Sequence, residues 1–209
     1  MDEASLLDRI ARGLREPLPG IPAQLSMAVD PRPGHKPYYE VEETCRKAGV
    51  LVLLYRRDGR LYVLLTLRTD RVLHHRGQVS FPGGEQHPGE SIEATALRET
   101  EEEIGLDLSA VRILGRLTPL YVPPSNYCVY PTVAFFPSDP EFHPQPDEVA
   151  EVIEVPLADL ADPASVRRES WDLGGRRADV PYFAAAGHRI WGATAMILSE
   201  FVALLGASR

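Results

Sequence analysis

A β-hairpin signal around residue 58 constrains the fold of this chain more than any other feature of the sequence. Two runs rich in aliphatic and β-branched residues, AGVLVLLYRR and RLYVLLTLR, flank the dipeptide Asp58-Gly59. An Asp-Gly pair between two such runs is the strongest short-range indication of a two-residue hairpin turn. We therefore expect a β-hairpin in the first half of the chain.

Other helices and strands follow from the spacing of apolar residues and from turn residues. The Pro- and Gly-rich segment 17–40 is expected to wrap the surface as irregular chain, and Pro131 suggests an edge strand or a bulge. This order of elements predicts an α+β (mixed α/β) fold, a mixed sheet with helices packed on its faces. The expected helices are 4–15, one from about Ser91 to Gly105, and 192–205; the expected strands are 48–57, 60–68, 78–84, 111–117, 127–136 and 150–157.

Composition narrows the class of protein. The 209 residues are 44% hydrophobic and 25% charged, enough for one large domain with a full core. The net charge of −8 argues against nucleic acid as a partner, and no apolar run approaches the roughly 20 residues that cross a bilayer. Cys45 and Cys128 make neither a disulfide framework nor a metal cluster, and the N-terminus is unlike a signal peptide. We expect a soluble cytoplasmic protein, a monomer or a homodimer.

The segment RETEEEIG, residues 98–105, collects carboxylates at the end of a predicted helix. Carboxylates there are unfavourable, since the helix macrodipole is negative at its C-terminus. Glu99, Glu102 and Glu103 have the spacing i, i+3 and i+4, so we expect all three to lie on one side of the helix. A hard cation such as Mg²⁺ or Mn²⁺ would neutralise them. The alternative is a solvated acidic helix end.

The residues around these glutamates resemble the signature of the Nudix hydrolases. The segment GEQHPGESIEATALRETEEEIGL, residues 84–106, departs from it only at Thr100, where an aliphatic residue is usual. The resemblance implies a Nudix-type α/β/α sandwich over one domain, residues 1–209, with an N-terminal helix and wrapping segment (about 1–45), a core (46–160) and a C-terminal hairpin and helix (161–209). The matching positions are Gly84, Glu90, Arg98, Glu99, Glu102, Glu103, Gly105 and Leu106.

The Nudix resemblance assigns the metal ligands. Glu99, Glu102 and Glu103 would bind a divalent cation, Mg²⁺ or Mn²⁺, and the carbonyl of Gly83 or Gly84 would add a further oxygen ligand. The bound cation would help to deprotonate a water molecule and would neutralise charge on the phosphoryl group that is transferred.

The same resemblance assigns two supporting roles. Arg98 would bond Glu90 and the neighbouring carboxylates and fix their orientation. One of the glutamates of the signature, or a carboxylate from a later loop, would accept the proton of the attacking water. Glu148 is the candidate for that later carboxylate, and the alternative is an acid on a surface loop.

The residues just before the signature resemble the additional motif of the coenzyme A diphosphatase branch of this family. Thr69 and Leu73 depart from that motif, and His74, His75 and Arg76 follow directly. Segments 147–157 and 188–198 also look like that branch. The matching residues of the segment LLTLRTDRVLHHRGQVSFPGG (64–84) are Leu64, Leu65, Thr66, Arg68, Gly77, Phe81, Pro82, Gly83 and Gly84.

This second resemblance implies a small-molecule nucleotide substrate, coenzyme A or a derivative, cleaved to 4′-phosphopantetheine and adenosine 3′,5′-bisphosphate. Arg68, Arg71 and Arg76 are candidate phosphate contacts, with a solvated basic loop as the alternative. The aromatic segment 121–131 is a candidate for stacking on the adenine, and core or loop packing is the alternative for each tyrosine. Two other functions stay open: a diphosphatase for ADP-ribose, NADH or dinucleoside polyphosphates, and a non-catalytic nucleotide-sensing module.

Overall fold

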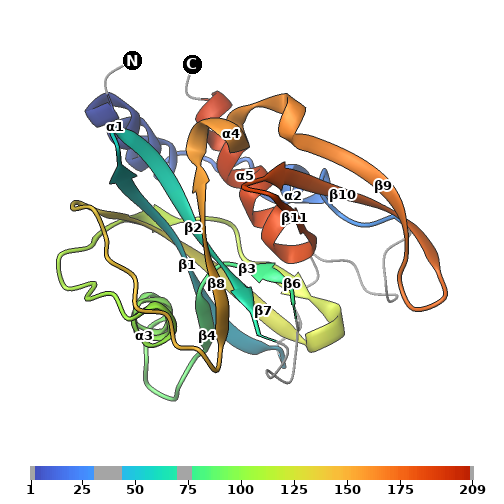
Figure 1. Cartoon of the computed structure of the whole chain (residues 1–209), viewed down its shortest axis with the longest axis horizontal. Coiled ribbons are helices and arrows are strands. Elements are labelled where there is room, and N and C mark those ends of the chain that lie inside the picture. The colour runs from blue at the N-terminus through green and yellow to red at the C-terminus, as the bar shows by residue number, and fades with distance from the viewer. Residues whose placement is uncertain (1–2, 31–43, 70–76, 208–209) are drawn as a thin grey trace.

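The structure, a computed structural model, describes residues 3–30, 44–69 and 77–207. Figure 1 shows how the helices and strands are arranged. In chain order they are α1 (Glu3–Gly13), α2 (Gly20–Leu25), β1 (Arg46–Arg57), β2 (Arg60–Arg68), β3 (Val79–Ser80), β4 (Gly83–Glu85), α3 (Ile92–Ile104), β5 (Arg112–Arg116), β6 (Leu120–Val122), η1 (Pro123–Ser125), β7 (Tyr127–Phe136), β8 (Val149–Pro156), α4 (Leu157–Ala161), η2 (Pro163–Ser165), β9 (Val166–Asp172), β10 (Arg177–Ala185), β11 (His188–Trp191) and α5 (Gly192–Ala207).

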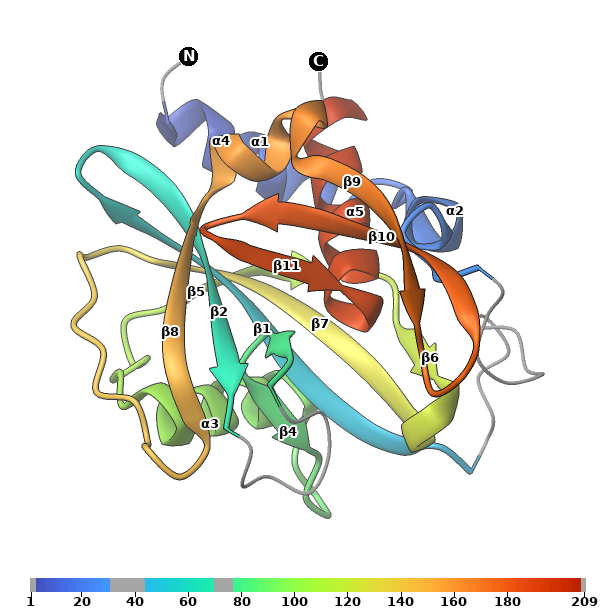
Figure 2. The ribbon, with the colours of Figure 1, turned by 45° about the vertical axis from the view of Figure 1, so that its right-hand side comes forward.

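The larger sheet has eight strands and is mixed, as predicted. Its central path runs β3-β2-β1-β7-β5, while β4 pairs with β1, β6 with β7 and β8 with β2. The central pair β1 and β7 is parallel, and the other pairs are antiparallel. A second sheet of three antiparallel strands, β11-β10-β9, lies on the same side of the large sheet as α5 (Figure 2).

The hairpin expected at Asp58-Gly59 is confirmed. Strands β1 and β2 pair up to Arg57 opposite Arg60, which leaves two residues in the turn. Both have positive φ, 50° at Asp58 and 72° at Gly59. That conformation is the one a type I′ turn needs, and Asp-Gly adopts it at low cost. The turn therefore fixes the register of β1 and β2.

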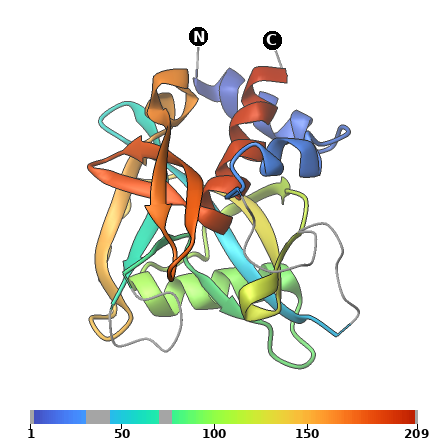
Figure 3. The same ribbon diagram turned by 90° about the vertical axis from the view of Figure 1, so that its right-hand side faces the viewer.

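Helix α3 covers one face of the large sheet, and α5 with α1 covers the other (Figure 3). Alternate residues of β1 serve the two faces, because side chains along a strand point to opposite sides. Leu51 and Leu53 are buried with Ala96 and Ile104 of α3. At Gly49 the helix approaches so closely that an added Cβ would lie 2.6 Å from the carbonyl oxygen of Ile92. The sheet thus holds α3, and the glutamates that α3 carries, against β1.

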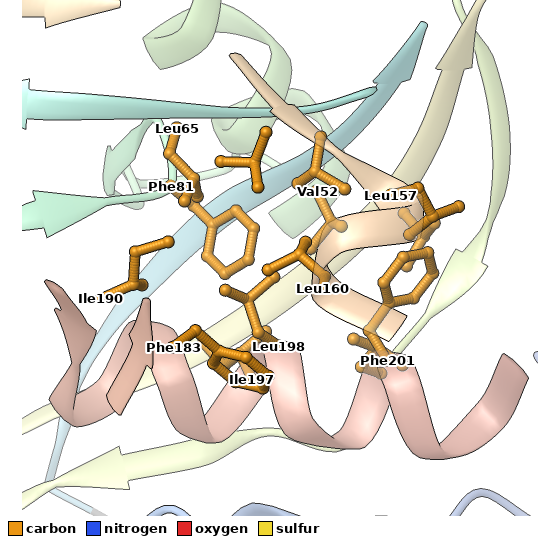
Figure 4. Packing of buried hydrophobic residues seen from close by; sticks show 14 of the residues in the cluster. Val52, Leu65, Phe81, Leu157, Leu160, Phe183, Ile190, Ile197, Leu198 and Phe201 are labelled. Atoms are coloured by element: carbon orange, nitrogen blue, oxygen red, sulfur yellow. The ribbon is translucent and has the colours of Figure 1, made fainter. Parts of the chain in front are cut away.

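The core on the opposite face is larger. It combines Val52 of β1 and Leu65 of β2 with Ile197, Leu198 and Phe201 of α5, all buried (Figure 4). The three-stranded sheet and α4 contribute to the same cluster, so the C-terminal hairpin packs on the core as an integral part of it. Among the described residues, no helix is long and apolar enough to span a bilayer.

Three features differ from the sequence-based expectations or go beyond them. Strand β7 is not at an edge: β1 flanks one side, and on the other β6 pairs as far as Val129 and β5 from Thr132. Pro131 falls in the gap between those two ladders, where a missing N–H breaks no ladder bond, and the irregularity lies in β5. Cys45 and Cys128 form a disulfide between the start of β1 and β7. Helix α2 lies in the segment expected to be irregular.

Candidate active site

Helix α3 begins and ends where the sequence predicts. The Ser91 hydroxyl accepts a hydrogen bond from the Ala94 N–H at 3.1 Å, which caps the N-terminus. Gly105 ends the helix with φ of 62°. Thr100, the departure from the signature, is fully buried, and its hydroxyl donates to the Ala96 carbonyl at 2.6 Å. Its polar atom is therefore satisfied, and Thr100 is compatible with the helix.

Two glutamates of α3 face Gly83 and Gly84, which lie in strand β4 where the sequence predicted a Gly-Gly turn. Glu103 has only 3% of its side chain exposed; its Oε2 accepts from the Gly83 N–H at 3.2 Å, and its Oε1 accepts from Arg68 at 3.3 Å. The carboxylate of Glu99 lies against Gly84, where an added Cβ would come within 2.3 Å of its carboxyl carbon. These two carboxylates, with Gly83 and Gly84, line one cavity.

Burial perturbs the Glu103 carboxylate. Desolvation raises the pKa of Glu103 to about 7, and the charges of Glu148 and Glu99 raise it further, while Arg68 and the Gly83 N–H act in the opposite direction. Near neutral pH the group is thus poised between its protonated and ionised forms. A cation beside it would favour the ionised form and release a proton.

Arg98 holds the other carboxylates in place. Its Nε donates to Glu90 at 2.9 Å, and its Nη1 donates to Glu99 at 2.7 Å and to Glu102 at 3.3 Å. Glu90 also accepts from the Thr95 hydroxyl at 2.8 Å. Because of its hydrogen bonds to Arg98, the pKa of Glu90 falls to about 2. Glu90 therefore stays ionised at any ordinary pH and anchors the guanidinium that orients Glu99.

The expectation that three glutamates converge holds for two of them. Glu102 is 61% exposed and does not line the cavity with Glu99 and Glu103. Successive helical residues are about 100° apart, so Glu102 projects to one side of Glu103 although the two are neighbours. Within the ranges that the structure describes, no three Asp, Glu, His or Cys side chains are arranged to hold a metal ion. The role of Glu102 as a ligand stays a prediction.

The remaining predicted residues divide into three groups. Glu148 lines the same cavity as Glu99 and Glu103, which agrees with its choice as the carboxylate from a later loop. Arg68 also lines it but is paired with Glu103, so the structure gives it a contact to a carboxylate. Arg71 and Arg76 lie outside the described residues, and their contact with phosphate stays a prediction.

Sequence reasoning did not foresee the apolar part of this cavity. The cavity has a volume of about 800 Å³ and extends from the carboxylates to the N-terminal turn of α5. Trp191, Met196 and Ile197 line that part, together with Val29 and Leu120. In the sequence, the segment HRIWGATAMIL shows only a resemblance to the diphosphatase branch. Its apolar residues follow the helix period, which did not reveal that several of them border a cavity.

Comparison with known proteins agrees with this geometry. The model of the NUDIX domain family matches residues 46–173, more than half of the chain. The chain belongs to the Nudix family. It is a Nudix pyrophosphohydrolase, as the family model and its hydrolase relatives indicate.

Several relatives resemble this Nudix protein over much of its length. It is 39% identical to the Nudix hydrolase NudL of Photorhabdus laumondii, over 66% of this chain and 74% of that protein. It is 38% identical to human mitochondrial coenzyme A diphosphatase NUDT8, over 76% of this chain and 69% of that protein. With mouse peroxisomal coenzyme A diphosphatase NUDT7 the identity is also 38%, over 62% of this chain and 55% of that protein.

A solved structure shows the same fold. The crystal structure of a MutT/nudix family protein from Enterococcus faecalis aligns with a TM-score of 0.51 at 21% identity, covering 80% of this chain and 63% of that one. Nudix hydrolases generally depend on divalent metal. The donor set here fits such an ion: the Glu99 and Glu103 carboxylates and the backbone carbonyls of Gly83 and Gly84 supply oxygen ligands, which Mg²⁺ and Mn²⁺ prefer.

Proposed function

We propose that this Nudix hydrolase cleaves the diphosphate of coenzyme A or its derivatives, releasing 4′-phosphopantetheine and adenosine 3′,5′-bisphosphate, with Mg²⁺ or Mn²⁺ as its cofactor. The observation that carries the proposal is the set of residues that line one cavity. It combines a pair of carboxylates, Glu99 and Glu103, with an apolar lining of Trp191, Met196 and Ile197.

The chemistry of the substrate matches those two parts. Coenzyme A joins a diphosphate to a long uncharged arm on one side and a nucleotide on the other. ADP-ribose, NADH and dinucleoside polyphosphates carry a second sugar or nucleoside there, whose hydroxyl and base groups would lose hydrogen bonds to water against an apolar wall. The apolar lining therefore favours the pantetheine arm, because its methyl, methylene and thiol groups give it more apolar surface than a second sugar has. The motif at residues 64–84 and the names of the mitochondrial and peroxisomal relatives support the same choice.

Each group of this chain has a defined task in the proposed reaction. A bound divalent cation would lower the pKa of the attacking water and neutralise negative charge on the diphosphate. Glu99 and Glu103 would hold that cation with the carbonyl oxygen of Gly83 or Gly84, and Glu102, as the signature predicts, would be a further carboxylate ligand. Arg98 orients Glu99 through direct hydrogen bonds.

The proton of the attacking water needs an acceptor near the carboxylate pair. Glu148 is our candidate, because it lines the same cavity and lies close enough to Glu103 to influence its ionisation. A glutamate of the signature is the alternative acceptor. Comparing the pH profiles of kcat/KM for Glu148→Gln and wild type assigns the role: loss of the acidic limb, on which activity rises as the essential base loses its proton, identifies Glu148 as the acceptor.

The test is turnover of four substrates with Mg²⁺ and with Mn²⁺: coenzyme A, an acyl-coenzyme A, ADP-ribose and NADH. We expect the highest kcat/KM for a coenzyme A compound, and chromatography should show 4′-phosphopantetheine and adenosine 3′,5′-bisphosphate in equal amounts. Glu102→Gln and Glu103→Gln should each lower kcat by orders of magnitude.

Glu141→Gln is the matched control, since the Glu141 side chain is 88% exposed, and it should retain full activity. Preference for ADP-ribose or NADH would refute the proposed substrate. A wild-type protein that binds nucleotide and hydrolyses none of the four would instead identify a sensing module.

A further inference from the structure

We propose that Tyr127, whose hydroxyl is held by Arg46 and Glu85, is the ring on which the nucleobase of the substrate stacks. This inference rests on the proposed function for the identity of the base, an adenine. It adds a specificity residue and divides the cavity into a nucleobase end at Tyr127 and an apolar end at Trp191.

Tyr127 has the guanidinium of Arg46 beside its ring and forms part of the cavity lining. Arg46 lies directly across from Tyr127 in the parallel β1–β7 pair, and its guanidinium carbon is 4.3 Å from the ring centroid. Tyr127 is one of the residues that line the cavity, whereas Arg46 is not among the lining residues in the described part of the chain. Arg46 also donates a hydrogen bond to the Tyr127 hydroxyl, so its guanidinium lies at the hydroxyl end of the ring, and the ring itself forms part of the cavity wall.

Several contacts fix the orientation of this ring. The Tyr127 hydroxyl donates to Glu85 Oε2 at 3.1 Å, and Arg46 Nε donates to Glu85 Oε1 at 3.0 Å, so one carboxylate holds both residues. The Cys45–Cys128 disulfide links the residue before Arg46 to the residue after Tyr127. A ring that is already immobile loses little conformational entropy when a ligand stacks on it.

The surroundings of Tyr127 suit a purine better than those of Trp191 do. Glu85 and Ser125 line the cavity beside Tyr127 and offer hydrogen-bonding oxygens to the polar edge of a base. Trp191 lies among Leu173, Met196 and Ile197, where the ring nitrogens and amine of adenine would lose hydrogen bonds to water without replacement. The base is thus favoured at Tyr127 and the uncharged arm at Trp191.

The position of Tyr127 relative to the carboxylates agrees with this division. Glu85, which accepts from the Tyr127 hydroxyl, directly follows Gly84, and the Glu99 carboxylate packs against Gly84. Glu85, which binds the Tyr127 hydroxyl, therefore lies one residue along β4 from Gly84, beside which the diphosphate would be held. A nucleotide with its phosphate at Glu99 can extend towards Tyr127 along the same wall of the cavity.

The test uses the two reaction products as separate probes. Calorimetric titration in Mg²⁺ measures the binding of adenosine 3′,5′-bisphosphate and of 4′-phosphopantetheine to wild type, Tyr127→Leu and Tyr127→Phe. We expect Tyr127→Leu to weaken the nucleotide by roughly 5- to 150-fold, the range produced by losing one base–aromatic stack. Its affinity for 4′-phosphopantetheine should stay within about twofold of wild type. Tyr127→Phe keeps the ring and should restore nucleotide binding.

Trp191→Leu is the matched control at the other end, and it should weaken 4′-phosphopantetheine more than the nucleotide. Equal nucleotide affinity in wild type and Tyr127→Leu would overturn the inference, as would equal weakening of both probes. Coenzyme A turnover of the wild type separates the two proposals. Turnover without dependence of nucleotide binding on Tyr127 refutes only the stacking, whereas Tyr127-dependent nucleotide binding without turnover refutes only the coenzyme A assignment.

Discussion

Replacing the buried Glu103 with glutamine should make the metal-free protein more stable at alkaline pH, although the same change removes a proposed metal ligand. The side chain is 3% exposed, and burial raises its pKa from an ordinary value of 4.5 to about 7. Since the folded protein then binds its proton more tightly than the unfolded chain does, ionisation of Glu103 opposes folding.

The sign and size follow from that difference. Below pH 4.5 Glu103 is protonated in both states and imposes no penalty. As pH rises from 4.5 through about 7, the unfolded chain releases its proton before the folded protein does. The free energy of unfolding therefore falls over this range. The full loss is about 3 kcal/mol, because one pKa unit is worth about 1.4 kcal/mol. Glu103→Gln abolishes this loss, and the broken ion pair with Arg68 offsets part of the gain.

Urea denaturation in EDTA at pH 5 and pH 8 measures this prediction. Between those values the free energy of unfolding of wild type should fall by about 2–3 kcal/mol more than that of Glu103→Gln. Adding Mg²⁺ at pH 8 should then stabilise wild type, by about 2.7 kcal/mol at a hundredfold excess over Kd, and leave the variant unchanged.

The exposed Glu141→Gln variant serves as the control and should follow wild type at both pH values. Parallel pH dependences for wild type and Glu103→Gln would refute the reasoning, because the buried carboxylate would then carry no desolvation penalty. A variant less stable than wild type at pH 8 in EDTA would refute it as well.

Two further predictions concern the frame of the site. Gly84→Ala should abolish Mn²⁺-dependent turnover while the protein still folds, because the added Cβ would displace the Glu99 carboxylate. Gly206→Ala adds its Cβ in open space and should leave kcat unchanged. Equal activity of the two variants would contradict this prediction. Cys45→Ser should lower the free energy of unfolding by about 2–4 kcal/mol, since it opens a loop with a sequence separation of 83 residues; melting curves with and without a reducing agent check it, and a wild type indifferent to reduction would count against it.

Local signals in the sequence predicted the parts of the fold that depend on neighbours along the chain. The Asp58-Gly59 turn, the Ser91 cap and the Gly105 stop each rest on the conformation of a few residues, and all three are confirmed. Helix α2 was missed because its six residues begin in a Pro- and Gly-rich segment. It is held by the buried Glu200, which accepts hydrogen bonds from Gly20 and Gln24 about 180 residues earlier. Contacts over such a separation leave no local pattern.

The same division applies to the site. The signature identified Arg98 and Glu90 as partners, and the structure shows their hydrogen bonds. Helix periodicity alone placed Glu102 with Glu99, but the cavity, which depends on where β4 crosses the helix, includes Glu99 and leaves Glu102 in solvent. The contact of Arg46 with Tyr127 could likewise not be predicted, because it joins residues 81 positions apart and depends on the register of β1 and β7.

The most direct test of the central claim, that Glu99 and Glu103 bind a divalent cation on which diphosphate hydrolysis depends, is a Mn²⁺ titration followed by electron paramagnetic resonance. Coenzyme A turnover is measured in the same samples. For wild type we predict that turnover rises with bound Mn²⁺, and for Glu99→Gln and Glu103→Gln that both are lost together. Full turnover of coenzyme A in EDTA, or unchanged Mn²⁺ binding in both variants, would contradict the claim.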